Sequence, residues 1–261
     1  MNMYTTIETS MENRVFTIWL NRPDVHNAFN TTMLEELAEC FLDLQSTDAV
    51  CVILRGKGKS FCAGADLNWM KAVAQNSYEA NYQESLLLSK CFYAIYMCAK
   101  PTIALVHGVS LGGANGLVSA CDLAYCTNDA SFSLSEVKIG IVPACISPYV
   151  VKRVGEYGTK ELMLTGRRIN GKEAETFHLV NKSVPAGQLD VTVEETIKHL
   201  RTSGPAAMGH GKKLIYEVTN NLSLKEAYDF TARMIADIRA SEEGQEGINA
   251  FLEKRKPKWV E

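Results

Sequence analysis

The 261-residue sequence predicts an α/β domain that is followed by a helical C-terminal region. Before Pro185, short apolar runs typical of buried strands alternate with longer segments that have the spacing of amphipathic helices. After Pro185, four helical segments follow one another with no strand between them. This change of pattern indicates a mixed core and a second, purely helical unit.

The elements of the first part follow from local patterns. The apolar run at 15–20 and the segment at 4–8 before it predict a hairpin. Asn30 can cap a helix over 31–45 whose apolar residues share one face, and Pro101 ends a long helix over 78–99. The other expected elements are strands at 50–55, 103–106, 123–126 and 179–184, a loop at 60–66, and helices at 67–74 and 114–120.

The helical region has four expected helices, over 191–200, 205–218, 224–240 and 243–255. Exposed apolar faces on such helices often serve the packing of oligomers. The run FLEKRKPK at 251–258 has four cations in five positions at its end, which can bind phosphate but which is also typical of a solvated terminal helix.

Composition excludes several classes of function. A net charge of -3 gives no broad basic field and argues against nucleic acid as a partner. No apolar run reaches the roughly 18 residues of a membrane span, and the N-terminus has no signal-peptide pattern, so we expect a cytoplasmic protein without a membrane partner. The eight cysteines form no CxxC pair and the five histidines are scattered. We therefore expect buried, reduced thiols and no metal.

Two small-residue turns are candidates for binding a developing negative charge. The motif HGVSLGG at 107–113 lies between an expected strand and an expected helix, where backbone N–H groups have no partner within the helix. The loop FCAGADL at 61–67 also leads into a helix. The N–H groups of Gly113 and Ala65 could together form an oxyanion hole. Alternatively, the glycines only permit close packing, and Asp66 only caps the helix that follows.

Glu136 is the candidate acid or base. It lies in the segment SLSEVKIG at 133–140, among apolar neighbours rather than on a solvated helix face. Beside two oxyanion donors, such a carboxyl would have a raised pKa suited to proton transfer. The alternative is an ordinary surface glutamate that caps a turn.

A rival interpretation is a serine hydrolase. The motif GVSLG at 108–112 matches the G-x-S-x-G nucleophile elbow. A catalytic triad would also need an acid and then a histidine downstream, and the histidines available are His178, His199 and His210. The last two lie on expected helices and no loop is suited to present a histidine, so we disfavour a serine nucleophile.

Taken together, the motifs resemble the crotonase, or enoyl-CoA hydratase/isomerase, superfamily over essentially the whole chain. The resemblance implies a crotonase-type spiral of ββα turns, with an acyl-CoA-binding core over 1–200 and a helical trimerisation region over 201–261. It also implies an acyl-CoA thioester substrate and a homotrimer or a homohexamer built as a dimer of trimers. The motifs that carry it are LNRP at 20–23, SFCAGADL at 60–67, HG at 107–108, GG at 112–113, CDLA at 121–124, FSLSEV at 132–137, LTGRRI at 164–169 and FLEKR at 251–255.

The resemblance also assigns roles to residues. Ala65 and Gly113 would hold the thioester oxygen through their N–H groups, and Glu136 would move protons. A neighbouring subunit would supply Phe251 and Lys254 as CoA contacts. The remaining substrate-binding residues implied are Val25, His26, Ala63, Asp66 and Leu67 along CoA, and Trp69, Gly116 and Ile146 around the acyl group.

The main departure from the family pattern is Gly116, because classical hydratases have a water-activating glutamate there. We expect an enoyl-CoA hydratase in which Glu136 acts alone, or in which Asn115, Ser119 or Ser147 orients the water. A Δ3-Δ2 enoyl-CoA isomerase, which uses one glutamate, and a CoA-ester-binding or RNA-binding member without catalysis are the alternatives. The segments around Trp69, Gly116 and Ser147 look most like those of bacterial methylglutaconyl-CoA hydratases, which favours a branched or carboxylated substrate.

Overall fold

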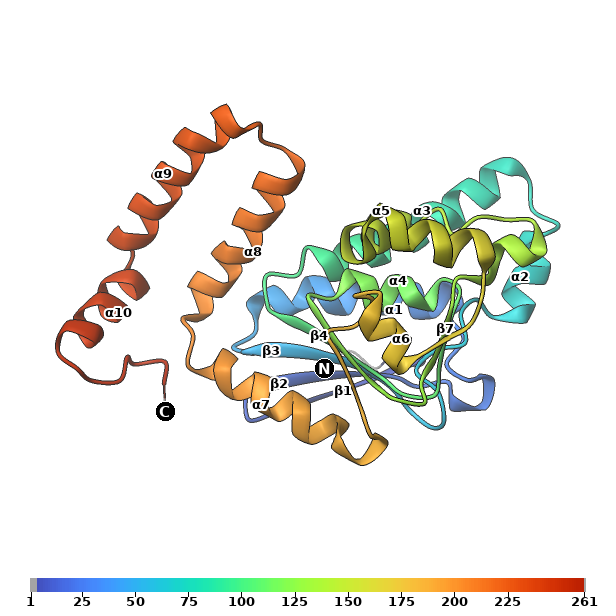
Figure 1. Ribbon diagram of the computed structural model, residues 1–261, viewed down its shortest axis with the longest axis horizontal. Helices are drawn as coiled ribbons and strands as arrows, with labels where there is room; N and C mark the ends of the chain where they lie inside the picture. Colours follow the sequence, from blue (N-terminus) through green and yellow to red (C-terminus); the bar gives the residue numbers. More distant parts are fainter. Residues whose placement is uncertain (1–3, 261) are drawn as a thin grey trace.

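The computed structural model describes residues 4–260, and its core is built on two sheets (Figure 1). In the six-stranded sheet, β1 pairs antiparallel with β2, and all other neighbours are parallel. Its strands, in spatial order, are β1 (Ile7–Glu12), β2 (Val15–Leu20), β3 (Cys51–Gly56), β4 (Thr102–Val106), β6 (Leu123–Thr127) and β9 (Lys182–Val184). The smaller sheet contains β5 (Val109–Leu111), β7 (Ser131–Ser133) and β8 (Ile169–Asn170).

Helices cover both faces of the large sheet. On one face, Ile53 and Leu105 pack against Val193 and Ile197 of α7. On the other face, the main core includes buried residues of α1, α3, α4 and α5. The helices are α1 (Thr31–Asp43), α2 (Leu67–Val73), α3 (Tyr78–Tyr96), α4 (Ala114–Ala120), α5 (Ser147–Thr165), α6 (Gly171–Thr176), α7 (Leu189–Arg201), α8 (Pro205–Asn220), α9 (Leu224–Ala240) and α10 (Glu242–Leu252).

The parallel strands form a spiral of ββα turns. After β3, the chain reaches Cys62, which forms a parallel bridge with Ser110 of β5. β5 in turn runs parallel to β7, just as β3, β4 and β6 run parallel in the large sheet. Successive turns therefore add backbone to both layers, as strands or as single bridges, before a helix follows, and this confirms the expected α/β spiral.

Most predicted elements are present, but some boundaries differ. The first strand lies at Ile7–Glu12 rather than 4–8, because the hairpin closes through Asn13 and Arg14, whose φ angles of 48° and 61° suit a tight turn. Asn30 caps α1 as predicted, its side chain accepting a bond of 3.0 Å from the Met33 N–H. The short strands β5, β7 and β8 were not predicted, because pairing with distant segments stabilises them rather than local preference.

The C-terminal helices α8, α9 and α10 extend away from the spiral (Figure 1). Within the described part of the chain, α8 and α9 have no buried residue, and α10 has only Ala250. Large apolar side chains are accordingly exposed, among them Leu224 at 94% and Tyr228 at 83%. These surfaces are consistent with a region that packs against other subunits.

The structure of residues 4–260 bears on three expectations, which concern membrane spanning, metal binding and the state of the cysteines. None of the helices in this range is both long enough and apolar enough to cross a membrane. In the same range, no group of three or more His, Cys, Asp or Glu side chains is placed to hold a metal ion. The eight cysteines are free thiols and seven are buried, as predicted, and burial raises the pKa of the Cys62 thiol to about 12.

Candidate active site

The glycine turn between β5 and α4 is held by a buried network. The Gly112 N–H donates to the Ser133 carbonyl over 2.8 Å, and Gly112 has a φ of +52°, which favours glycine. The Asn115 side chain donates to the carbonyls of Gly112 and Ser133 over 3.0 and 2.9 Å, and it accepts from Ser110 Oγ over 3.1 Å. This network fixes the position of Gly113, the first residue before α4.

The small-residue loop runs alongside β5 and so reaches the same place. The Cys62 N–H donates to the Val109 carbonyl over 3.0 Å, and the Leu111 N–H donates to the Cys62 carbonyl over 3.2 Å. A methyl group placed on Gly64 would lie only 2.6 Å from the Leu111 carbonyl oxygen, so only glycine permits this approach. The loop therefore passes directly beside the strand that leads to Gly113.

Phe29 connects the two turns. Its N–H donates to the Gly64 carbonyl and its carbonyl accepts from the Asp66 N–H, both over 2.9 Å, so its backbone brackets Ala65. Its ring lies 2.7 Å from where a methyl group on Gly113 would be. Sequence reasoning missed this residue, since a buried phenylalanine outside any motif carries no signal of position.

The two predicted donors remain available. Among the described residues, neither the Ala65 N–H nor the Gly113 N–H donates to a backbone carbonyl or a side chain. Both belong to turns that lead into helices, where N–H groups lack an intrahelical acceptor. The structure thus brings together two unpaired N–H groups from separate turns, which is the arrangement an oxyanion hole requires.

Glu136 lies against the glycine turn. It belongs to a short 3-10 helix over Ser135–Ile139, and its Oε1 is 3.3 Å from where a methyl group on Gly112 would be. Its Oε2 is buried and has no hydrogen-bond partner among the described residues. Burial raises the pKa of Glu136 above its usual range, and a backbone hydrogen bond opposes this only in part. The alternative of a well-solvated surface glutamate is therefore wrong.

The position of the missing second carboxylate is filled by apolar side chains. A methyl group on Gly116 would lie 2.3 Å from Ile146 Cγ2 and 2.7 Å from Phe92 Cζ. Ile146 and Phe92 are themselves buried. No side chain larger than hydrogen fits at Gly116 without displacing one of them, so this wall of the site is apolar and closely packed.

The residues expected along CoA form one edge of the same loop. The His26 carbonyl accepts from the Ala63 N–H over 2.9 Å, and His26 Nδ1 lies 3.0 Å from Ser60 Oγ. Val25 is 42% exposed and Leu67 is 74% exposed, so both are accessible to a ligand.

The Asp66 carboxylate does not face solvent. It caps α2 by accepting from the Asn68 N–H over 2.8 Å, and it pairs with Arg22 Nη2 over 2.8 Å. Burial opposes ionisation, but the hydrogen bonds and charge of Arg22 hold the pKa of Asp66 below its usual range. The alternative in which Asp66 caps the helix is therefore confirmed, and its side chain supports the loop rather than offering a free ligand group.

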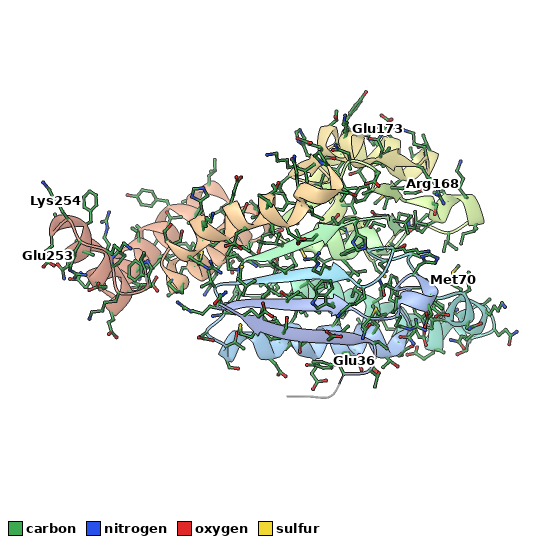
Figure 2. The ribbon with its side chains drawn as sticks, turned by 90° about the horizontal axis from the view of Figure 1, so that it is seen from below. Glu36, Met70, Arg168, Glu173, Glu253 and Lys254 are labelled. Atoms are coloured by element: carbon green, nitrogen blue, oxygen red, sulfur yellow. The ribbon has the colours of Figure 1, made fainter. Side chains whose placement is uncertain are left out.

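The remaining predicted residues divide into two groups. Trp69 lies near the loop, with its ring 5.8 Å from that of Phe29 and its indole N–H bonded to Glu84. Phe251 and Lys254 lie at the far end of the molecule from α2, as the positions of Lys254 and Met70 in Figure 2 show. The chain therefore does not bring this pair to its own candidate site.

The structure also bears on the other roles considered for polar residues, as a serine nucleophile or as a group that orients water. Ser110 is fully buried and bonded to Asn115, so it cannot act as an exposed nucleophile. Asn115 is committed to the glycine turn, and Ser147 Oγ donates to the Ala144 carbonyl over 2.8 Å. Among these residues and Ser119, which lies elsewhere, none offers a free group that would orient a water molecule beside Glu136.

Comparison with known proteins agrees with this geometry. A model of the enoyl-CoA hydratase/isomerase family matches residues 10–261. The peroxisomal Δ(3,5)-Δ(2,4)-dienoyl-CoA isomerase of Arabidopsis thaliana is 32% identical over 100% of this chain and 99% of its own length. The short-chain-enoyl-CoA hydratase of Clostridium acetobutylicum is 31% identical over 94% of both chains.

A solved structure shows the same fold. The crystal structure of an enoyl-CoA hydratase from Shewanella pealeana superposes with a TM-score of 0.94 and 35% identity, covering 98% of this chain and 96% of that one. The family match spans the spiral, both turns, Glu136 and the C-terminal helices. The chain belongs to the enoyl-CoA hydratase/isomerase family.

Proposed function

We propose that this protein is an enoyl-CoA hydratase, which adds water across the 2,3 double bond of an enoyl-CoA thioester. The observation that carries the proposal is the unpaired, half-buried carboxylate of Glu136 beside the two free N–H donors of Ala65 and Gly113. Coenzyme A is part of the substrate, and the proposed chemistry needs neither a metal nor a further cofactor.

The reaction follows from these three groups. The thioester oxygen accepts hydrogen bonds from the Ala65 and Gly113 N–H groups, which stabilise the negative charge that develops on it. The water oxygen bonds to the β-carbon while the Glu136 carboxylate takes one of its protons, and Glu136 then delivers that proton to the α-carbon. One carboxyl group thus serves both steps, and general acid–base catalysis of this kind typically contributes about 100- to 10,000-fold.

A Δ3-Δ2 enoyl-CoA isomerase is the second candidate, and one observation favours it. The packing of Ile146 and Phe92 against Gly116 leaves no second carboxylate and an apolar surface where hydratases of the classical type activate water. Glu136 alone could take a proton from C2 of a 3-enoyl thioester and return it to C4. Both reactions depend on Glu136 and on the same pair of donors.

For the substrate, we propose a branched or carboxylated enoyl-CoA such as 3-methylglutaconyl-CoA. The support is the resemblance of the segments around Trp69, Gly116 and Ser147 to those of methylglutaconyl-CoA hydratases. The other residues in substrate contact are then Val25, His26, Ala63 and Leu67 on the CoA side, with Ile146 on the acyl side.

We also propose that the chain works as a homotrimer or as a hexamer made of two trimers. The support is the exposed apolar surface of α8, α9 and α10, and the distance of Phe251 and Lys254 from the chain's own site. In such an assembly, a neighbouring copy would supply both residues to CoA. Light scattering of the purified protein gives the mass that tests this arrangement.

The experiment that tests the catalytic proposal separates binding from turnover. Glu136→Gln keeps the size of the side chain but removes the proton carrier, so turnover should fall by about 100-fold or more while the affinity for an acyl-CoA ester stays within about threefold. Glu195→Gln, an exposed glutamate of α7, is the matched control. Full activity of Glu136→Gln would refute the assignment of Glu136.

A further inference from the structure

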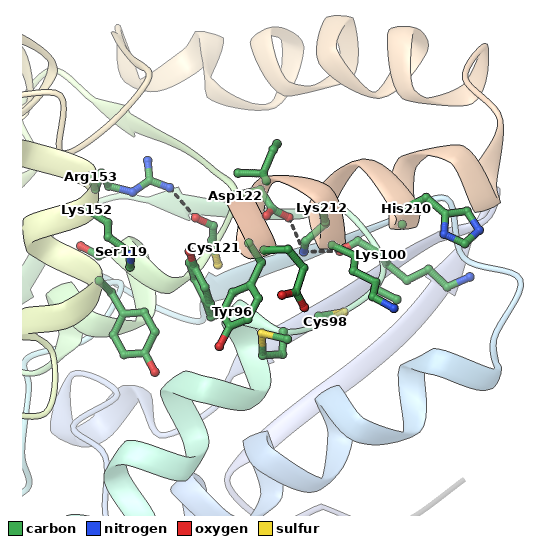
Figure 3. Close-up of a pocket in the computed structure, with 18 of the residues that line it drawn as sticks. Tyr96, Cys98, Lys100, Ser119, Cys121, Asp122, Lys152, Arg153, His210 and Lys212 are labelled. Atoms are coloured by element: carbon green, nitrogen blue, oxygen red, sulfur yellow. Dashed lines mark hydrogen bonds and ion pairs between the residues drawn. The ribbon is translucent and has the colours of Figure 1, made fainter. Parts of the chain in front are cut away.

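A cavity lies at the opposite end of the strands from the candidate active site. It has a volume of about 1110 Å³ and is bordered by α8 and by residues that precede β4, β6 and β9, such as Lys100, Asp122 and Asn181 (Figure 3). The two turns of the candidate active site, in contrast, follow β3 and β5. Nothing in the proposed reaction uses this cavity.

The walls of the cavity are basic although the chain as a whole is acidic. Its cationic lining residues are Lys100, Lys152, Arg153, Lys212 and Lys213. Only three carboxylates line it, and each has a partner; Glu217 accepts from the Asn221 side chain over 2.8 Å. Asp122 pairs with Lys212 over 2.7 Å, and Glu243 accepts from the N–H groups of Ala206 and Ala207 at the start of α8.

Several of these cations lack a counter-charge. Arg153 donates to the Cys121 carbonyl and, over 3.4 Å, to the Asn181 side chain, but it forms no ion pair with a carboxylate in the described part of the chain. Burial lowers the pKa of its guanidinium. Within residues 4–260, Lys100 and Lys213 likewise make no ion pair. Arg153 and Lys100 are partly buried and Lys213 is exposed, so an anion bound at this place would meet cations that no ion pair among the described residues occupies.

An unpaired hydroxyl lies in the wall of the same cavity. Ser119 is only 4% exposed, and its Oγ has no hydrogen-bond partner among the described residues. Ser119 lines the cavity at the end of α4, two residues before Cys121, whose carbonyl holds Arg153. Ser119, Lys152 and Arg153 are among the lining residues drawn in Figure 3. A buried donor of this kind normally has a ligand or a water as its acceptor.

We propose that this cavity is a binding site for an oxyanion, the phosphate or carboxylate group of a small metabolite, with Arg153 and Ser119 as its central partners. A guanidinium presents N–H groups in a fork that matches two oxygens of either group, and its present contacts leave further donors unused. Ser119 adds a neutral donor, while Lys100 and Lys213 add charge that raises affinity at low ionic strength.

The test is calorimetric titration of the full-length protein, without substrate, using inorganic phosphate, pyrophosphate and citrate in turn. The proposal predicts one saturable site per chain, and the strongest of the three anions tells whether phosphate or carboxylate is preferred. Arg153→Gln should weaken binding by tenfold or more and Ser119→Ala by about fivefold. Arg168→Gln, an exposed arginine outside the cavity, is the matched control and should bind as the wild type does.

Two further measurements keep the test decisive. If Arg153→Gln fails to fold, Ser119→Ala and Lys213→Gln still report the site, and Lys213→Gln should lower affinity about threefold at low salt only. The proposal is overturned if none of the three anions gives a saturable heat, or if the folded Arg153 and Ser119 variants bind like the wild type. Because no turnover is measured, failure here leaves the hydratase proposal unaffected.

Discussion

The packing around Gly116 makes a sharp prediction about stability. In Gly116→Ala, the new methyl group would lie 2.3 Å from Ile146 Cγ2 and 2.7 Å from Phe92 Cζ, where ordinary contacts between carbon atoms are about 3.5–4.0 Å. Both neighbours are buried and have little room to move. We therefore expect a packing cost at the upper end of the usual range for overpacking, about 3 kcal/mol.

A smaller effect acts in the opposite direction. Alanine is better than glycine inside a helix by about 1 kcal/mol, and Gly116 lies in α4. The net loss should then be about 2 kcal/mol, which lowers the melting temperature by roughly 4–8 °C for a chain of this size. Packing wins over helix propensity at this position.

The assay is thermal unfolding of four variants beside the wild type: Gly116→Ala, Gly211→Ala, Ile146→Ala and the double variant Gly116→Ala/Ile146→Ala. Gly211→Ala in α8 is the matched control, because nothing lies within 4 Å of the added methyl group, and it should raise stability by about 0.5–1 kcal/mol. Adding Ile146→Ala to Gly116→Ala removes the nearest clashing atom, so the double variant should lose about 1 kcal/mol less than the two single losses combined. If Gly116→Ala is as stable as Gly211→Ala, the account of this wall is wrong.

Three other predictions follow from the site. Burial raises the pKa of Glu136, so the folded state holds the proton of this carboxyl more firmly than the unfolded state does. Glu136 therefore destabilises the fold as the pH rises past the usual pKa range of a glutamate. The melting temperature of Glu136→Gln should exceed that of the wild type at pH 8 but not at pH 4. Ser110→Ala should keep its turnover and lose about 1 kcal/mol from the bond to Asn115, and a loss of all activity would revive the serine nucleophile. Asp66→Ala removes the cap of α2 and the partner of Arg22, so it should lower the free energy of unfolding in urea by at least about 1 kcal/mol. Asp66→Asn should keep most of the cap and lose less. Equal losses of stability in the two variants would contradict a capping role.

Local features of the fold could be predicted because their causes are local. The Asn30 cap, the apolar face of α1 and the end of α3 before Pro101 depend only on residues within a few positions of one another. The strands β5 and β7 could not, since three-residue strands form only through pairing with segments far along the chain. The bounds of β1 were predicted wrongly because they depend on the turn at Asn13, where the sequence has no strong turn motif.

The same distinction between local and tertiary causes applies to the candidate active site. Ala65 and Gly113 could be proposed because a glycine-rich turn before a helix leaves N–H groups unpaired whatever the surroundings. The ring of Phe29 between the two turns and the packing of Ile146 and Phe92 on Gly116 are tertiary contacts, which spacing along the sequence does not encode. The partly buried Arg153 was missed because an arginine in an amphipathic helix is usually solvated.

The most direct test of the central claim is the mass of the products that the wild-type enzyme forms from crotonyl-CoA, 3-methylglutaconyl-CoA and a 3-enoyl-CoA. The account predicts that at least one 2-enoyl thioester gains one water, that the acyl group turned over fastest is the branched or carboxylated one, and that Glu136→Gln gives no such product. Conversion of the 3-enoyl ester to its 2-enoyl isomer without any hydration would contradict the hydratase proposal and favour the isomerase. No change in any of the three substrates would contradict a catalytic role for Glu136 altogether.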